Sequence, residues 1–379
     1  MNAFKNDFPS EFENTDIIIG TDPDADRCGV VVKVPEAQQP LHDNYDYTLL
    51  PADDMWALVV WYRLQQELSE GEVRDAAKKF IVLSHTTSDS LTRLARKYGL
   101  GFIKTWVGFA ALAAGVRDVW EGKEIRDLTN GRESSNSDLC DPFICENEAM
   151  GNGQRSFNVA AMEQSNGFSI LGGPPPDEFS LGTGGHVRDK DGTFAALLIA
   201  EIAAWAKARG TTLYNLLDRE IYLDPKIGLF VNHYEPDPLI GEYPGIEGDR
   251  KKLVILRRTL GYFQLAKAGD LEIGGLPVKD ACIFRTGKYD RIYPPTYDFQ
   301  FPDEGIRFFF DDEERRQHNK ERLDHVTVRP SGTGNSLRFH VQLHADVSES
   351  NLVSEKARLR TQAQQVADHI RELIKAPRG

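Results

Sequence analysis

The stretch DIIIGTDPDADRCGVVVKV, residues 16–34, holds two short apolar runs separated by an acidic loop. The first run, 17–19, consists of three isoleucines and ends at Gly20, which is typical of a buried strand. The second run, 28–34, is rich in valine and predicts another strand. Downstream, strand-like runs alternate with helical patterns, of which 191–209 is the clearest. This alternation predicts an α/β fold with parallel sheets.

The loop between the two apolar runs places Asp22, Asp24 and Asp26 at alternate positions. Alternate side chains of an extended loop point the same way, so the three carboxylates can converge. Like charges this close repel one another unless a cation lies between them, and hard oxygen ligands of this kind suit Mg²⁺. A solvated acidic turn and a phosphatase nucleophile loop are the alternatives. An EF-hand is a poor fit, because its glycine and distal glutamate are missing.

The amino-acid composition changes along the chain. Residues 35–51 are polar and contain three prolines, which is typical of a connection between domains. Residues 219–311 are rich in Pro, Gly and Tyr and predict short strands, and a terminal amphipathic helix is expected over 348–375. We therefore predict three domains, with the boundaries 1–50, 51–244 and 245–379.

A second motif, RPSGTG at residues 329–334, lies between two strand-like runs. Successive backbone N–H groups in such a turn form a nest for an anion, and the hydroxyls of Ser331 and Thr333 add donors. Arg329 adds a forked cation that suits a phosphate group. An ordinary hairpin turn is the alternative.

Two further segments carry a weaker signal. EQSNG, residues 163–167, sets a carboxylate, an amide and a hydroxyl in a row, which suits hydrogen bonds to neighbouring sugar hydroxyls. HVRDKDG, residues 186–192, leads into the long helix, and cations beside a helix N-terminus can hold a phosphate. A histidine such as His186 can act as an acid or a base. A surface loop and a capped helix start with surface ion pairs are the respective alternatives.

The composition excludes several classes of function. The chain has 58 acidic and 45 basic residues, a formal charge of −13, so a broad nucleic-acid-binding surface is not expected. Its longest apolar stretches are shorter than the roughly 18 residues that cross a bilayer, and the first residues form no apolar signal core. Four cysteines without disulfide or zinc spacing fit a reducing compartment. We therefore expect a cytoplasmic protein that binds neither nucleic acid nor membrane.

In their order along the chain, DPDADR, EQSNG, HVRDKDG and RPSGTG resemble the α-D-phosphohexomutase superfamily, and within it the phosphoglucomutase/phosphomannomutase branch. The resemblance implies mixed-sheet α/β domains followed by a smaller α+β C-terminal domain, with residues 1–50 as a remnant of the second family domain. It also implies an intramolecular phosphotransferase that interconverts hexose 1-phosphate and hexose 6-phosphate through a bisphosphate intermediate, with Mg²⁺ as cofactor.

The resemblance also implies a role for each motif residue. Carried over by motif, the metal ligands are Asp22, Asp24 and Asp26. The catalytic groups are Arg27, His186 and Lys190. The groups that bind the hexose phosphate are Glu163, Ser165, Arg188, Arg329, Ser331, Gly332 and Thr333.

The sequence departs from the family pattern in one respect that bears on activity. The phosphoserine of the family usually lies in a Thr-Ala-Ser-His-Asn-Pro type of loop, and these 379 residues contain no such loop. The pair Ser84-His85 is followed by Thr-Thr-Ser and is a poor substitute. We therefore expect a C-terminal part of a mutase, inactive alone and complemented by a missing N-terminal segment or partner chain. The alternative is a non-catalytic sugar-phosphate-binding module or a split-enzyme subunit.

Overall fold

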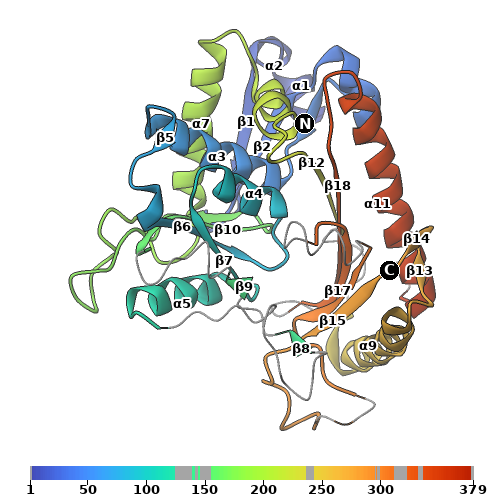
Figure 1. Cartoon of the computed structure of the whole chain (residues 1–379). Helices are drawn as coiled ribbons and strands as arrows, with labels where there is room; N and C mark the ends of the chain where they lie inside the picture. Colours follow the sequence, from blue (N-terminus) through green and yellow to red (C-terminus); the bar gives the residue numbers. More distant parts are fainter. Residues whose placement is uncertain are drawn as a thin grey trace.

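The computed structural model describes residues 2–123, 139–140, 144–145, 155–235, 243–294, 296, 299–310, 322–331 and 336–376. They form a mixed α/β structure around three main sheets, which confirms the predicted fold class (Figure 1). Only the middle sheet has a parallel centre, so the expectation of parallel sheets holds for that part alone.

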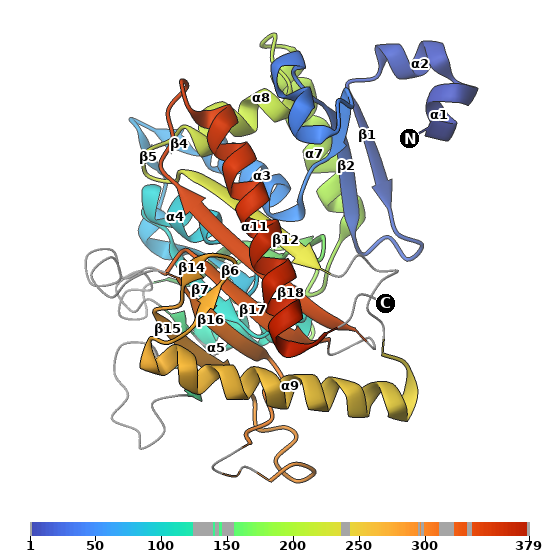
Figure 2. The same ribbon diagram turned by 90° about the vertical axis from the view of Figure 1, so that its right-hand side faces the viewer.

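The first sheet is an antiparallel meander in the order β1 (Ile17–Thr21), β2 (Cys28–Lys33), β3 (Tyr47–Leu49). Alternate residues of β2 are buried, because one face of this sheet packs against the long helix α7 (Gly192–Lys207). The helices α1 (Asn2–Asp7) and α2 (Pro9–Asn14) precede the sheet and stand beside it in Figure 2. The acidic loop is therefore the turn of a hairpin, and not the end of a parallel strand.

The middle sheet has the order β11 (Gly167–Ser169), β10 (Phe157–Glu163), β6 (Lys79–Ser84), β7 (Gly101–Thr105), β9 (Ile144–Cys145). Strands β10, β6 and β7 are parallel, and nearly every described residue in them is buried, as expected for a sheet covered on both faces. The covering helices are α3 (Ala52–Gln66), α4 (Asp89–Lys97), α5 (Phe109–Trp120) and α7. Glu163 and Ser84 therefore meet at the same edge of the sheet.

The third sheet has the order β12 (Leu229–Glu235), β18 (Leu337–Ala345), β17 (His325–Pro330), β16 (Gly305–Phe309), β15 (Asp280–Phe284), β8 (Leu139–Cys140). Two long helices, α9 (Gly245–Ala268) and α11 (Leu352–Ile374), cover one of its faces (Figure 2). The division into three domains stays a prediction, but β12 pairs with β18 across the expected boundary at residue 245.

Helix α9 was missed by the expectation of short strands over residues 219–311. Its buried positions Ile255, Leu256, Thr259, Leu260 and Phe263 recur at the spacing of one helix face. Prolines on either side of the helix, and the glycines Gly248 and Gly261 inside it, obscured that period. Shorter elements complete the fold: η1 (Glu36–His42), β4 (Leu68–Ser69), β5 (Glu72–Val73), η2 (Ala76–Lys78), α8 (Leu213–Leu217), η3 (Asp218–Tyr222), β13 (Glu272–Ile273) and β14 (Leu276–Pro277).

The third sheet has one apolar and one polar face, and both are buried. Along β17, Val326 and Val328 point to the face that the long helices cover. The opposite face carries the buried polar residues Arg307, His325, Thr327, Arg329, His340, Gln342 and His344. They meet the buried polar segment 84–90 and Lys104 of the middle sheet. The two sheets are therefore joined mainly through hydrogen bonds and charges, with a small apolar cluster of Cys282, Phe284 and Phe309 packed against Trp106.

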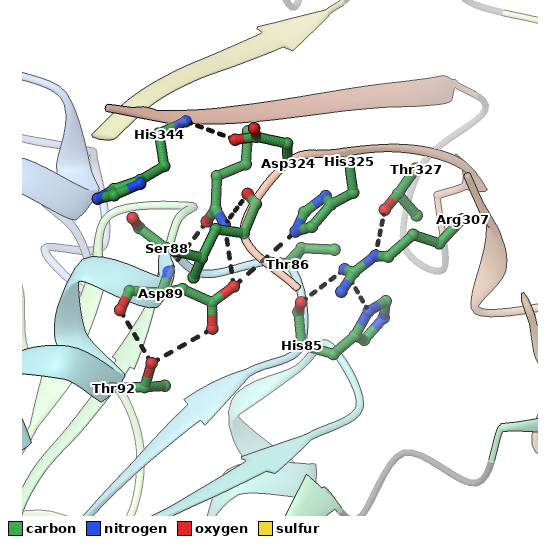
Figure 3. A network of polar contacts seen from close by, with 12 residues as sticks. His85, Thr86, Ser88, Asp89, Thr92, Arg307, Asp324, His325, Thr327 and His344 are labelled. Carbon is green, nitrogen blue, oxygen red and sulfur yellow. Dashed lines mark hydrogen bonds and ion pairs between the residues drawn. The ribbon is translucent and has the colours of Figure 1, made fainter. Parts of the chain in front are cut away.

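Figure 3 shows the centre of this polar junction. Asp89, the first residue of α4, forms an ion pair with buried Lys104 and accepts a hydrogen bond of 2.9 Å from the side-chain amide of Gln342. In return, the Asp89 backbone N–H donates to the Gln342 side-chain oxygen at 2.9 Å. Arg307 donates to the backbone oxygen of His85 at 2.7 Å and to the Thr327 hydroxyl at 2.7 Å. Many buried polar groups are thus paired across the junction, although neither ring nitrogen of His340 has a hydrogen-bond partner.

Among the described residues, no helix combines the length and the apolar character needed to cross a membrane.

Candidate functional site

The acidic loop brings its three carboxylates together. One oxygen from each of Asp22, Asp24 and Asp26 lies within 4.8 Å of the others. The loop is shaped by Ala25, which has a positive φ of 56°, and by the Arg27 N–H, which donates to Asp22 Oδ1 at 3.1 Å. Repulsion among the three charges makes this arrangement costly without a cation. The assignment of these three residues as metal ligands stays a prediction.

The chemistry of these residues fits Mg²⁺. The Oδ1 atom of Asp26 is buried and has no hydrogen-bond partner, although Arg27 Nε lies 3.6 Å away. A buried carboxylate oxygen without a partner is unfavourable, and a cation among three carboxylates would satisfy it. Asp24 is exposed, so an ion in solution could reach the three carboxylates.

Helix α7 fixes the position of the acidic loop. Its first residue, Gly192, donates its N–H to the Ala25 carbonyl at 3.0 Å. A Cβ atom at Gly192 would lie 2.4 Å from the Arg27 backbone, so only glycine allows this approach. The preceding Lys190 forms an ion pair of 2.6 Å with Asp26 Oδ2. Burial by itself would raise the pKa of Asp26, but the hydrogen bond and charge of Lys190, together with Arg27, lower it.

The predicted sugar-binding loop lies directly beside the acidic loop. Gly167 pairs with Arg27 as an antiparallel β-bridge, and the Asn166 amide donates to the Cys28 carbonyl at 2.9 Å. The aliphatic part of Lys190 covers Gly167, where a Cβ atom would lie 2.6 Å from the lysine chain. The structure therefore brings the EQSNG and HVRDKDG segments to the acidic loop.

Glu163 lies at the centre of these contacts. It is buried at the end of β10, and its Oε1 accepts a hydrogen bond of 2.5 Å from the Gly108 N–H. Ser165 donates its hydroxyl to Glu163 Oε2 at 3.3 Å. Burial raises the pKa of Glu163, and the charges of Lys190 and Arg329 oppose that rise. Glu304, the partner of Arg329, accepts a hydrogen bond from the backbone of Val107, next to Gly108, so the sugar loop and the start of the phosphate loop meet at the 107–108 turn.

Arg329 enters the site from the third sheet. It is buried, and its Nε donates to Glu304 Oε2 at 3.2 Å. The same carboxylate oxygen lies 3.4 Å from His85 Nε2. The next residue, Ser331, closes the loop by donating its N–H to the Ser336 carbonyl at 2.8 Å. The predicted ligands Gly332 and Thr333 lie outside the described residues.

Two predicted residues lie apart from this group. The His186 ring stacks on Phe194 at 4.3 Å and forms an ion pair of 3.0 Å with Asp191, the N-cap of α7. The Arg188 guanidinium donates to the Ser180 carbonyl and is exposed. The contacts of His186 are those of a capped helix start, which was the alternative reading of this segment. A role in catalysis for His186 and in substrate binding for Arg188 stays a prediction.

Three residues of the site were missed in the sequence. His85, Glu304 and Arg307 lie behind Arg329, and Glu304 links His85 to Arg329. Burial raises the pKa of Glu304, while Arg329 acts in the opposite direction. His85 lies more than 200 positions from Glu304 and Arg307 along the chain, and no local motif surrounds the three residues. Only the pairing of two sheets reveals them.

Ser84 is not placed like an exposed nucleophile. Its side chain is fully buried, with hydrogen bonds of 2.7 Å to the Thr87 hydroxyl and 2.8 Å to the Gln164 side-chain oxygen. A serine that exchanges a phosphoryl group must reach the substrate, and this one is enclosed. The geometry therefore agrees with the expectation that Ser84 does not replace the family's phosphoserine.

We expect Asp24→Asn to weaken Mg²⁺ binding at least about 10-fold, because the variant removes one of three anionic ligands. Isothermal titration in the presence of glucose 1,6-bisphosphate would measure it. Asp16→Asn, an exposed acid just before β1 that pairs with Lys207, is the matched control. Equal Mg²⁺ affinity in Asp24→Asn and the control would contradict the metal assignment.

Comparison with known proteins places this site in context. Over 215 residues the chain is 27% identical to glucose 1,6-bisphosphate synthase of Mus musculus, covering 56% of this chain and 26% of that protein. It is 21% identical to human phosphopentomutase over 364 residues, covering 93% of this chain and 46% of that protein. It is 24% identical to phosphoglucomutase of Staphylococcus aureus over 332 residues, covering 87% of this chain and 45% of that protein. No protein-family profile matches the chain.

Solved structures were compared as well. A phosphoglucomutase/phosphomannomutase family protein of Burkholderia thailandensis superposes with a TM-score of 0.43 at 14% identity, covering all of this chain and 52% of that one. A second structure is N-acetylphosphoglucosamine mutase of Aspergillus fumigatus in complex with GlcNAc-6P and magnesium. It superposes with a TM-score of 0.40 at 12% identity, covering 94% of this chain and 48% of that one.

The sequence relatives define a class: this is a protein related to phosphosugar-converting enzymes. More particularly, the curated proteins it resembles are named glucose 1,6-bisphosphate synthase, phosphopentomutase and phosphoglucomutase, which confirms the resemblance expected from the motifs. It spans between about a quarter and a half of the length of the curated relatives it matches.

Proposed function

We propose that the chain supplies the metal-binding, sugar-binding and phosphate-binding parts of a phosphosugar mutase that interconverts hexose 1-phosphate and hexose 6-phosphate through a bisphosphate. The observation that carries this proposal is the joining of three motifs in one site. Lys190 pairs with Asp26 of the acidic loop and packs on Gly167 of the sugar loop, and the 107–108 turn connects Glu163 with Glu304, the partner of Arg329. A cation at either end and a carboxylate between them suit a sugar that carries a phosphate at each end.

Each residue has a distinct task in this proposal. Arg329 binds the phosphate that does not react, and Glu304 holds its guanidinium in place. Glu163 and Ser165 accept and donate hydrogen bonds to sugar hydroxyls. Lys190 and Arg27 neutralise the charge of the transferred phosphoryl group, which is the largest contribution that a protein makes to such a reaction. Bound Mg²⁺, held by Asp22, Asp24 and Asp26, would add a Lewis acid for the same charge.

The isolated chain is proposed to lack turnover, because it contains no serine in the family's Ser-His loop and Ser84 is buried. We expect no conversion of glucose 1-phosphate to glucose 6-phosphate by the pure chain, even with Mg²⁺ and glucose 1,6-bisphosphate. A coupled glucose 6-phosphate dehydrogenase assay, with S. aureus phosphoglucomutase as the positive control, would measure this. Turnover above the background of heat-denatured chain would disprove it.

A second experiment tests the mutase assignment against its alternative, a non-catalytic binding module or split-enzyme subunit. The full chain is mixed with a separately produced N-terminal half of a related mutase that carries the phosphoserine. Restored turnover supports the mutase part. Tight binding of glucose 1,6-bisphosphate without restored turnover, using several halves, supports the binding module. The predicted cytoplasmic location rests on the sequence alone.

A further inference from the structure

A cavity of about 390 Å³ lies among elements that play no part in the sugar-phosphate site described above. Its walls come from the start of α3, the α8–η3 segment, β12 and the first half of α11. Figure 2 shows α11 lying across β12 and β18, so the cavity is bounded by a helix that belongs to the third sheet. Its volume is that of a pocket for a small molecule.

One wall of the cavity is a fixed positive charge. Lys356 is buried, forms an ion pair with Asp218 and donates to Gln38 Oε1 at 2.8 Å. Its ammonium group lies 4.6 Å from the ring centre of Tyr214 and 5.1 Å from that of Tyr222. These contacts satisfy the lysine, so Lys356 shapes the wall and needs no ligand.

A second cation in the cavity is not neutralised. Arg360, one helical turn after Lys356, donates to the Leu41 carbonyl at 2.7 Å and lies beside the Tyr214 hydroxyl. Among the described residues, no carboxylate oxygen lies within 4.0 Å of its guanidinium group. A guanidinium has five N–H donors, and most of those of Arg360 are left for another acceptor. Arg360 therefore offers a binding position for an anion.

A carboxyl group faces the same cavity without pairing with Arg360. Asp54 is only 8% exposed, and its side chain accepts a hydrogen bond from the Tyr222 hydroxyl. No cation of the described residues lies within 4.0 Å of it. Asn232 and Gln364 bring amide groups to the same space. A carboxyl group and amides, set apart from a cation, are suited to hydroxyl groups.

We propose that this cavity is a second ligand site, which binds a small hydroxyl-rich anion, that is, the phosphate ester or the carboxylate of a polyol. Arg360 binds the anionic end, and Asp54 with the neighbouring amides binds the hydroxyls. The rings of Tyr214 and Tyr222 provide apolar contact for the carbon skeleton. The site lies between η1, α8, β12 and α11, so a ligand there would connect the first and the third sheets.

The charge of Asp54 does not prevent an anion from binding nearby. Burial raises the pKa of Asp54 to about 7, an effect that the Tyr222 hydrogen bond reduces. At neutral pH a substantial fraction of the group is therefore uncharged and repels no anion. In that form it can also donate a hydrogen bond.

The test separates this site from the proposed sugar-phosphate site by using an Arg329→Gln background, in which the latter is weakened. Glucose 6-phosphate, gluconate, glucose and inorganic phosphate are titrated calorimetrically into the full chain. We expect saturable binding of glucose 6-phosphate or gluconate, and at least 10-fold weaker binding of glucose and of inorganic phosphate. Equal binding of inorganic phosphate and glucose 6-phosphate would overturn the assigned ligand class, and the absence of binding by every probe would overturn the site.

Two further variants locate the binding. Arg360→Gln is expected to weaken it at least 10-fold, whereas Arg358→Gln, on the exposed side of the same helix and paired with Glu355, leaves it unchanged. Asp54→Asn keeps the shape of the wall and is expected to change the preference for glucose 6-phosphate over inorganic phosphate by several-fold. Unchanged affinity in Arg360→Gln, with an unchanged melting temperature, would disprove the proposal. If Arg329→Gln alone abolished binding while Arg360→Gln alone left binding unchanged, all binding would belong to the sugar-phosphate site.

Discussion

Replacing Asp89 by alanine is expected to lower the free energy of unfolding by about 3–5 kcal/mol, because it leaves the buried ammonium of Lys104 without its partner. The variant also removes the acceptor of the Gln342 amide, so two sheets lose a shared contact. Urea unfolding at pH 7, followed by circular dichroism, measures the change.

The pH dependence of the same carboxylate gives a second readout. Burial alone would raise the pKa of Asp89, but Lys104 and His325 hold it well below the usual value of 3.8. A group with a lowered pKa in the folded state stabilises the protein above its unfolded pKa, and this stabilisation is lost as the pH falls. The wild type is therefore expected to lose more stability than Asp89→Ala between pH 5 and pH 3.

Controls for this prediction separate the ion pair from a general effect of removing an acid. Asp16→Ala removes an exposed acid that pairs with Lys207, and it should leave the free energy of unfolding nearly unchanged. The double variant Asp89→Ala with Lys104→Met should be less destabilised than the sum of the single variants, because both charges leave together. Additive losses would show that the pair does not act as a unit.

Replacing Arg329 by glutamine is expected to weaken the binding of glucose 1,6-bisphosphate at least about 30-fold, equivalent to about 2 kcal/mol. Glutamine removes both the charge and the two-pronged donor geometry that suit a phosphate, and it removes the cationic partner of Glu304 behind the site. Calorimetric titration of the full chain in the presence of Mg²⁺ measures the affinity.

Two companion variants make the Arg329 result specific. Arg329→Lys keeps the charge without the fork and should recover part of the affinity. Arg358→Gln removes an exposed arginine on α11 and should have no effect. Wild-type affinity in Arg329→Gln, with the fold intact, would remove the phosphate-binding role from this residue.

The sequence predicted well wherever a signal is local. The acidic loop was expected to gather three carboxylates, and the structure holds their oxygens within 4.8 Å of one another. The helix expected over 191–209 is α7, with Asp191 as its cap, and the strands expected around residue 330 are β17 and β18. Repulsion, capping and hydrophobic period act over a few residues, so a single sequence is enough to show them.

Some interactions of the site depend on segments that are distant in the sequence. Glu304 holds Arg329 and His85 at once, and it has no motif because its partners lie on other strands. Arg188, by contrast, lies within a motif but donates to Ser180, away from Lys190. The direction of a long side chain is set by the surface that packs around it, and the sequence does not contain that surface.

The sequence by itself determined the type of protein, an α/β chain with phosphohexomutase motifs, because residue types at fixed spacings carry that information. It also determined the alternation of valine with His325, Thr327 and Arg329 along β17. Such a period of two predicts a sheet with one apolar face and one face in water. Only the tertiary structure decided that the polar face is buried against residues 84–90 and Lys104. The physical reason is that polar groups can be buried when each meets a partner of opposite kind, and the partners here lie in a different sheet.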